Sequence, residues 1–469
     1  MLPEMPSSFR SFPCTRLLRL VLLVGIGLAS AGLGAVVLAD ESNTAHSQNP
    51  TQRLVTPDPK MPQDKGLDFS MGGGVFKTNW VAAPASTQAV DGLGPLYNAR
   101  SCNACHPGGT RTRDLTDLQG APVPGLLLHL SQMIAGKAGP DAAYGQQIQT
   151  SALANQQPEA RLSVKRIAGP QVTLADGTMV QLYRTEPELT DLAFGPLSPE
   201  TSVGLRIGPA IHGLGLLERI PEKVILAQVG HEAGVSGRPN QVLDIQSGKM
   251  RVGRFGWKAS QPSLMQQNAH AFAIDIGMSN RDFPAGSGDC TATEKACMEA
   301  PNGNSPQFGN VEIADSLLDL VDTFTRYAML PKTPASADAA TLVAGQKIFA
   351  ASGCIACHRP SFNLPASAGA PAQRIAPYTD LLLHKMGPGL ADGVVEGEAA
   401  GHEWRTAPLW GLGRAVTADG QGALLHDGRA ATILEAILWH GGEAATAQQR
   451  VVALDAVARE NLIAFLRSL

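Results

Sequence analysis

The sequence contains one five-residue pattern twice, Cys-x-x-Cys-His, at residues 102–106 and again at 354–358. Two thiols separated by two residues and followed by an imidazole form the attachment signature of c-type haem. In that chemistry both sulfurs bond to the porphyrin and the histidine binds the iron. A redox-active or structural Cys-x-x-Cys pair is the alternative interpretation. Because most of the 7 cysteines fall in these motifs, we predict two covalently bound haem c groups, held by Cys102, Cys105, His106, Cys354, Cys357 and His358.

The remaining cysteines predict one local crosslink. Cys14 lies near the N-terminus, which leaves Cys290 and Cys297 as an even pair among glycines. In an oxidising compartment such a pair favours a disulfide that closes a loop. A third redox centre is the alternative.

The N-terminal segment has the pattern of a secretory signal. Arg10, Arg16 and Arg19 precede an uncharged stretch that ends in small residues, and Asp40 follows. We predict a signal peptide at residues 1–39 and a periplasmic protein. Because the apolar stretch is about 20 residues long, an uncleaved inner-membrane anchor is the alternative, and we expect membrane contact only in that case.

Two haem motifs far apart in the chain predict two cytochrome domains. We expect a tether at 40–65, a first haem c domain at 66–330, a linker at 331–340 and a second haem c domain at 341–469. The predicted fold class is mainly α, with two c-type cytochrome domains of which the first carries β-hairpin insertions.

Hydrophobic periodicity predicts the elements inside these domains. We expect a helix at 126–134, in which His129 is a core or surface histidine and not a ligand. Alternation on either side of Asp176-Gly177 predicts one hairpin, and residues 242–252, turning at Ser247-Gly248, predict another. A helix at 345–349 before the second motif is expected to cross a C-terminal helix that contains Leu454, Val457, Leu462, Phe465 and Leu466.

The charge balance argues against a nucleic-acid partner. The formal net charge is −4, and lysine and arginine form no dense run. A phosphate backbone is bound by clustered positive charge. We therefore expect no binding to nucleic acid.

Three longer stretches carry a family resemblance: Gly-Pro-Leu-Tyr-Asn-Ala-Arg-Ser-Cys at 94–102, Arg-Phe-Gly-Trp-Lys-Ala at 254–259 and Leu-His-Asp-Gly-Arg at 425–429. With these, the chain resembles the bacterial di-haem oxidoreductases of the peroxidase type, also labelled thiol oxidoreductases, within the di-haem cytochrome c peroxidase superfamily. The resemblance covers essentially the whole mature chain. It implies reduction of hydrogen peroxide at the first haem, with electrons relayed from the second and supplied by a small redox protein. It also implies a Ca²⁺ between the haems, whose ligands the sequence does not identify.

The resemblance assigns roles near the first haem. In the peroxidases a Leu lies seven and a Gln ten residues after a conduit Trp, and Trp257, Leu264 and Gln267 keep these spacings. Trp257 would conduct electrons between the haems, and Gln267 would face the open side of the first. The peroxidases place a Glu ten residues after the Gln, whereas this chain has Gly277 there. Because peroxide cleavage needs a group that moves a proton, Asp275 becomes the candidate acid/base, with His270 as the alternative.

The resemblance also points to the sixth ligand of the second haem. The peroxidases have a Met fourteen residues after the His of a His-x-Gly segment, and here His440 stands fourteen residues after His426. We predict axial ligation by His358 and His440, with Met386 as the competing ligand. Two imidazoles would lower the haem potential relative to His/Met ligation. His212 as a resting-state cap on the first haem is a further alternative.

Two other functions remain open from the sequence. One is a non-catalytic di-haem electron-transfer cytochrome c in which both irons have six ligands. The other is a di-haem oxidase whose substrate is a protein side chain, as in the superfamily member that matures methylamine dehydrogenase.

Overall fold

The computed structural model describes residues 55–111, 125–232, 234–331, 337–367 and 369–469. The predicted signal peptide or anchor, most of the tether and the centre of the linker lie outside these ranges. Contacts join residues 49–469 into one compact unit, and the two domain boundaries stay predictions. In the described ranges, no helix has the length and apolar character that a membrane crossing requires.

The predicted fold class, mainly α, is wrong. The structure is 29% helix and 24% strand, which makes it mixed α/β. The strands form small antiparallel sheets, most of them two-stranded. Short strands separated by glycine-rich turns have too few residues for a clear period, so the sequence predicted only the two most regular hairpins.

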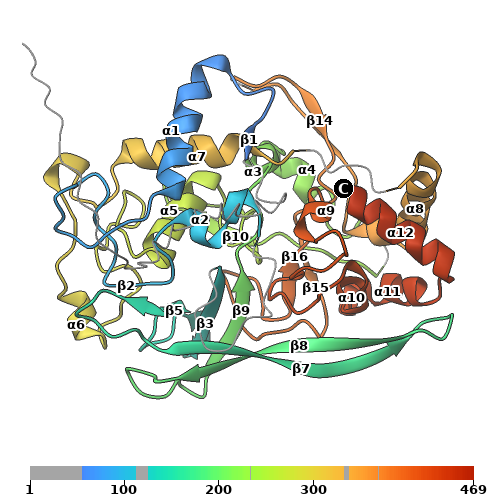
Figure 1. Cartoon of the computed structure of the whole chain (residues 1–469), viewed down its shortest axis with the longest axis horizontal. Helices are drawn as coiled ribbons and strands as arrows, with labels where there is room; N and C mark the ends of the chain where they lie inside the picture. The colour runs from blue at the N-terminus through green and yellow to red at the C-terminus, as the bar shows by residue number, and fades with distance from the viewer. Residues whose placement is uncertain (1–54, 112–124, 233, 332–336, 368) are drawn as a thin grey trace, which may run out of the picture. The chain divides into compact units, whose positions relative to one another are not determined.

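The helices include two that flank the first motif region, α1 and α5, and two that enclose the second, α8 and α12 (Figure 1). The α-helices are α1 (Gly66–Lys77), α2 (Cys102–Cys105), α3 (Leu214–Glu218), α4 (Glu222–Leu226), α5 (Leu264–Asp275), α6 (Lys295–Met298), α7 (Asp315–Tyr327), α8 (Ala339–Ala351), α9 (Leu412–Ala415), α10 (Ile433–Leu438), α11 (Ala445–Val452) and α12 (Ala456–Ser468). The strands are β1 (Thr56–Pro57), β2 (Leu96–Tyr97), β3 (Leu126–Ile134), β4 (Lys137–Gly139), β5 (Gln147–Ile148), β6 (Ser151–Ala152), β7 (Arg161–Thr173), β8 (Met179–Thr190), β9 (Thr201–Ile207), β10 (Gln241–Asp244), β11 (Lys249–Val252), β12 (Ala328–Met329), β13 (Phe362–Leu364), β14 (Gln373–Ile375), β15 (Leu383–Lys385) and β16 (Glu403–Arg405).

Residues 126–134 form strand β3 and not the predicted helix. Four of the first five residues are leucine, and a nearly continuous apolar run does not distinguish the two periods. In the strand, Leu126, Leu128 and Leu130 are buried in one core. Alternation turns Leu127 and His129 to the opposite face.

The register of the β3 sheet brings polar residues onto that opposite face. His129 pairs with Gln147 of β5, and Leu127 pairs with Arg206 of β9, both antiparallel. Directly opposed residues in an antiparallel pair share one face of the sheet. The sheet therefore presents His129, Gln147 and Arg206 together.

Both predicted hairpins and the predicted disulfide are confirmed. β7 pairs with β8 and β10 with β11, each antiparallel, and Cys290 is bonded to Cys297. The long β7–β8 hairpin extends from β9 to α10 (Figure 1). Its residues Leu174 and Leu182 pack into the core around Phe349, so a segment from the first half of the chain completes the core of the second.

The crossed helices around the second motif are also confirmed. Phe349 of α8 and Phe465 of α12 have ring centroids 5.5 Å apart. A Cβ on Gly345 would lie 2.1 Å from the carbonyl oxygen of Asn461, so the crossing needs glycine there. Val457, expected in the apolar face, is instead 67% exposed.

We predict that the α8–α12 contact stabilises the C-terminal half. Phe465→Ala should lower the free energy of unfolding by about 3–5 kcal/mol because it leaves a cavity beside Phe349. Val457→Ala on the exposed side of the same helix should change it by about 0.5 kcal/mol or less. Chemical denaturation followed by circular dichroism measures both, and equal effects would contradict the packing described.

Candidate functional site

The two motif histidines are held in the same way. The Nδ1 atom of His106 lies 2.7 Å from the carbonyl oxygen of Pro209, and Nδ1 of His358 lies 3.0 Å from that of Tyr378. A carbonyl only accepts hydrogen bonds, so each Nδ1 donates and each Nε2 keeps a free lone pair. Desolvation lowers the pKa of both imidazoles to about 4. Both rings are therefore neutral and oriented as metal ligands.

The motif cysteines form no disulfide in the structure. Desolvation, followed by the charge of neighbouring groups, raises the pKa of the Cys102 and Cys105 thiols to about 12. Desolvation also raises the pKa of Cys354 to about 11. Reactive redox cysteines have depressed pKa values, so these thiols do not resemble a dithiol redox centre.

The second motif opens into a largely apolar cavity. Cys354, Cys357, His358, Met386 and His440 all line it. The rings of His358 and His440 face each other with centroids 6.5 Å apart. Two imidazoles that bind one metal from opposite sides, with bonds of about 2 Å, hold their ring centres roughly 6 Å apart.

His440 is oriented for the same role as His358. Its Nδ1 donates to the carbonyl oxygen of Ala436 at 2.7 Å, which leaves Nε2 free. Desolvation lowers the pKa of its imidazole. The second cavity therefore fits a haem with two histidine ligands, and Met386 stays the competing prediction.

The cavity at the first motif has more polar groups in its lining than the second. Besides Cys102 and His106 it is lined by residues from β3, β5, β9, α5 and the segment before β16, namely His129, Gln147, Arg206, Gln267, His270, Asp275 and Glu396. Among the ring contacts of the described residues, no second imidazole faces His106. The structure thus brings Gln267 and Asp275 to one cavity with the first motif.

Helix α5 carries Gln267 and Asp275. It begins after Ser263, whose side chain accepts a hydrogen bond from the backbone N–H of Gln266. From this cap, Gln267, His270, Ala271 and Asp275 recur at helical spacing and line the cavity. Helical spacing therefore places them on one face, in a helix that the sequence analysis did not predict.

Asp275 is a carboxyl group held in a poorly solvated position. Desolvation raises its pKa, and a hydrogen bond from Gln147 opposes the shift. Gln147 Nε2 donates to Asp275 Oδ1 at 2.8 Å. A carboxyl whose pKa is moved toward neutrality is suited to exchange protons.

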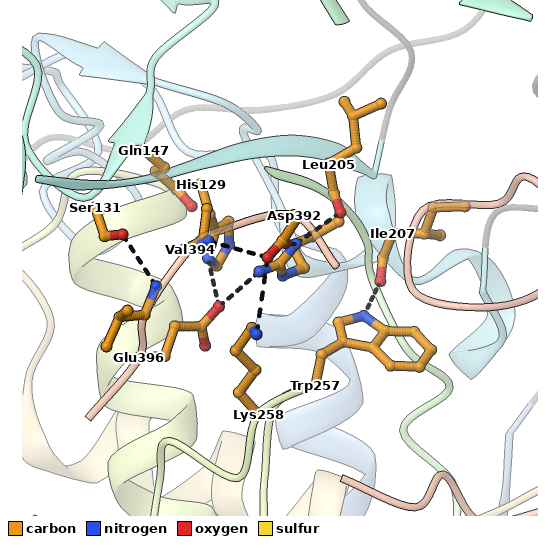
Figure 2. A network of polar contacts seen from close by, with 12 residues as sticks. His129, Ser131, Gln147, Leu205, Ile207, Trp257, Lys258, Asp392, Val394 and Glu396 are labelled. Carbon is orange, nitrogen blue, oxygen red and sulfur yellow. Dashed lines mark hydrogen bonds and ion pairs between the residues drawn. The ribbon is translucent and has the colours of Figure 1, made fainter. Parts of the chain in front are cut away.

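Sequence reasoning did not assign four of these residues to the site, Gln147, Arg206, His129 and Glu396, and the last two form a pair. Nδ1 of His129 lies 3.3 Å from Oε1 of Glu396, and Arg206 donates to the same oxygen at 3.2 Å (Figure 2). Burial alone would raise the pKa of Glu396, but His129, Arg206 and Lys258 together lower it. The alternation of residues 126–130 was the available signal for His129, whereas nothing local pointed to Glu396.

The two cavities share a wall. Trp257 lines both, as do Arg111 and Arg405. The indole Nε1 of Trp257 donates to the carbonyl oxygen of Ile207 at 2.7 Å, which fixes the ring (Figure 2). Trp257 therefore lies between the two motif sites, where the sequence analysis expected it.

The arginines of this wall fit an anionic group. Desolvation lowers the pKa of Arg111 and Arg405 to about 10. The Nε atom of Arg111 is buried without a hydrogen-bond partner, and the ion pairs among the described residues include neither arginine. Buried cations need compensating charge, which the propionates of two haems would supply.

The closest cluster of possible metal ligands among the described residues does not form a calcium site. Cys357, Asp380 and His384 form the one group of three whose ligand atoms lie within 4.8 Å of one another among the residues the structure describes. Cys357 belongs to the second motif, and His384 is paired with Asp380 and Glu443 at 2.9 Å each. Ca²⁺ takes six to eight oxygen ligands, so this group does not fit it, and Ca²⁺ stays a prediction.

His212 also lines the first cavity. Its Nε2 lies 2.9 Å from the carbonyl oxygen of Trp410, to which it donates. Its role as a resting-state cap stays a prediction.

Comparison with known proteins agrees with the paired motifs. Residues 191–469, more than half of the chain, match the profile of the family described as "Di-haem oxidoreductase, putative peroxidase". No curated protein matches significantly. The solved structure of Kuenenia stuttgartiensis hydrazine synthase, pressurised with 20 bar xenon, aligns with 43% of this chain and 70% of its own at 17% identity, but its TM-score of 0.23 is too low to inform the fold. The family match stands independently of that structure, and the chain belongs to the di-haem oxidoreductase family.

Proposed function

We propose that this protein is a periplasmic peroxidase with two covalently attached haem c groups. It reduces hydrogen peroxide at the haem held by Cys102, Cys105 and His106, with electrons stored at the haem held by Cys354, Cys357 and His358. A small redox protein supplies the electrons. One observation carries the proposal: the ring of His440 lies against that of His358 in the second cavity, whereas no imidazole of the described residues makes a ring contact with His106, whose cavity is lined by Gln267 and Asp275.

The polar side chains of the first cavity supply what peroxide reduction requires of the protein. Reducing one peroxide to two waters breaks the O–O bond and consumes two protons and two electrons. The bound haem would supply the coordination position and the path for electrons. Gln267 can orient the peroxide through its amide, and Asp275 can hold and return a proton. Both line the same cavity as His106.

Trp257 supports electron passage between the two sites. Its ring lines both cavities, and a hydrogen bond to Ile207 fixes it. A second haem with two imidazole ligands would have a lower potential than one with His/Met ligation. It would therefore favour electron transfer toward the first haem.

The electron-transfer alternative explains less of the structure. A carrier needs six-coordinate iron at both sites and has no use for the carboxyl and amide groups that converge beside His106. An oxidase acting on a protein side chain would share the ligand arrangement and differ in substrate. Direct assay separates the three functions.

The assay uses the purified holoprotein, reduced by one electron and mixed with hydrogen peroxide. We expect peroxide consumption with a reduced small cytochrome as donor, at a stoichiometry of two electrons per peroxide. A protein that binds neither peroxide nor cyanide in any redox state would be a carrier. One that forms oxidised protein product without turnover of the donor would be the side-chain oxidase.

We predict that His440→Met raises one haem potential and leaves the other in place. Thioether ligation favours Fe(II), so the shift should be on the order of 100 mV upward. Spectropotentiometric titration measures it. Unchanged potentials in His440→Met would show that His440 is not a haem ligand. Met386→Leu is the control for the competing ligand, and it should shift neither potential strongly.

We predict that Gln267→Ala lowers peroxide turnover about 100-fold, because a positioned polar group acting on the reacting atoms is worth about that factor. Haem content should be unchanged. Gln88→Ala, the same substitution at an exposed position, should have no effect. Wild-type turnover in Gln267→Ala would exclude the residue from the site.

A further inference from the structure

We infer that His129 is a catalytic acid–base residue on the open side of the first haem, and that Glu396 positions it. The inference rests on the proposed function and adds a proton-transfer group to the same cavity. Sequence analysis expected a core or surface histidine in a helix. The structure places it in a strand, on a face that lines the cavity.

The sheet determines where the imidazole lies. Leu128 and Leu130, its neighbours in β3, are buried in the opposite core, so strand alternation directs His129 toward the cavity. The opposed residue Gln147 reaches the same cavity and donates to Asp275. Backbone pairing thus fixes His129 beside the carboxyl already assigned to proton exchange.

Glu396 sets the tautomer of His129. Its Oε1 lies 3.3 Å from Nδ1 of His129, and the pKa of the carboxyl is lowered, so it accepts and does not donate. Nδ1 therefore carries the proton, and Nε2 keeps a lone pair. A carboxylate that orients an imidazole through Nδ1 is a general device for making Nε2 a base.

Glu396 is itself held from two sides. Arg206 donates to its Oε1 at 3.2 Å, and the backbone N–H of the preceding residue, Val395, donates to Ser131 Oγ at 3.0 Å. Ser131 lies two residues after His129 in the same strand (Figure 2). The strand that carries the base thus also anchors the segment that carries its carboxylate.

Four titratable or charged groups surround His129. Glu396 and Arg206 lie on one side. Asp275 and His270 of α5 are close enough to His129 to interact with it electrostatically. Burial is the larger cause of the His270 shift, which brings its pKa to about 4, so His270 stays neutral and His129 is the ring paired with a carboxylate.

The chemistry balances with these groups. Nε2 of His129 would take the proton from one peroxide oxygen and return it to the other as the O–O bond breaks, which releases one water and leaves the imidazole unchanged. The remaining oxygen would leave as the second water after it takes up two protons from solvent and two electrons from the electron-donor protein. Arg206 is ion-paired with both Asp392 and Glu396, so its part is to hold Glu396 in place.

The test compares His129→Gln with His231→Gln in the full holoprotein. His231 is an exposed histidine, so its variant controls for the chemical change alone. His129→Gln should lower the rate of peroxide turnover about 100-fold, the range of general acid–base catalysis. His231→Gln should match wild type.

Cyanide binding gives a second readout that a structural role would not change. Hydrogen cyanide must lose its proton to bind ferric haem, so a distal base accelerates binding near neutral pH. His129→Gln should bind cyanide about 100-fold more slowly at pH 7 and approach the wild-type rate as rising pH ionises the cyanide itself. Glu396→Gln should show a smaller loss, and Glu396→Asp should restore part of it.

The outcomes separate this inference from the proposed function. If wild type does not reduce peroxide but His129→Gln still slows cyanide binding, the peroxidase proposal fails and the proton-transfer role of His129 stands. If His129→Gln binds cyanide at the wild-type rate across pH, the inference is overturned whatever the peroxide activity. A wild-type protein that binds no cyanide at all would overturn both.

Discussion

A hydrogen bond from each motif histidine to a backbone carbonyl is the interaction on which both sites depend. His106 donates to Pro209 and His358 to Tyr378. Each bond fixes the ring orientation and the tautomer, so that Nε2 keeps its lone pair inside a cavity where desolvation disfavours protonation. The carbonyls lie outside the motifs, 103 residues from His106 and 20 residues from His358, so each ring is oriented by a segment other than its own motif.

From this common arrangement the two cavities diverge. The second is closed by His440, whose ring faces His358, and its walls are largely apolar. The first is lined by polar groups from α5 and from the β3 sheet, and no imidazole of the described residues makes a ring contact with His106. Trp257 lies in the wall between them. The proposed assignment of electron storage to the second site and of substrate binding to the first rests on this difference.

The sequence predicted the features that depend on local pattern. The two motifs, the turns of both hairpins, the α8–α12 pair and the Cys290–Cys297 bond are each encoded within a short stretch or by a strong period. Gln267 and Asp275 were chosen from the family resemblance, and one helix that was not predicted carries both. Local pattern did not identify the mixed α/β class, since the many short strands have little periodicity of their own.

The missed part of the site depends on pairing between distant segments. His129 and Glu396 are far apart in the chain, and they meet because β3 pairs with β9 while Ser131 anchors the segment before Glu396. The leucine-rich run around His129 fits a helix or a strand, and only tertiary pairing decides between them. For a histidine predicted to lie in a helix, the sequence indicated no neighbours. The strand register instead places His129 near Glu396 and Arg206 and in the lining of the first cavity.

The measurement that tests the central claim most directly is electron paramagnetic resonance of the fully oxidised and half-reduced holoprotein. The account predicts two different irons: one low-spin ferric signal from the site of His358 and His440, and one high-spin ferric signal, converted to low spin by cyanide, from the site of His106. Two low-spin signals in both redox states, unchanged by cyanide, would contradict it, because a protein side chain would then occupy the position that the polar cavity is proposed to leave for substrate.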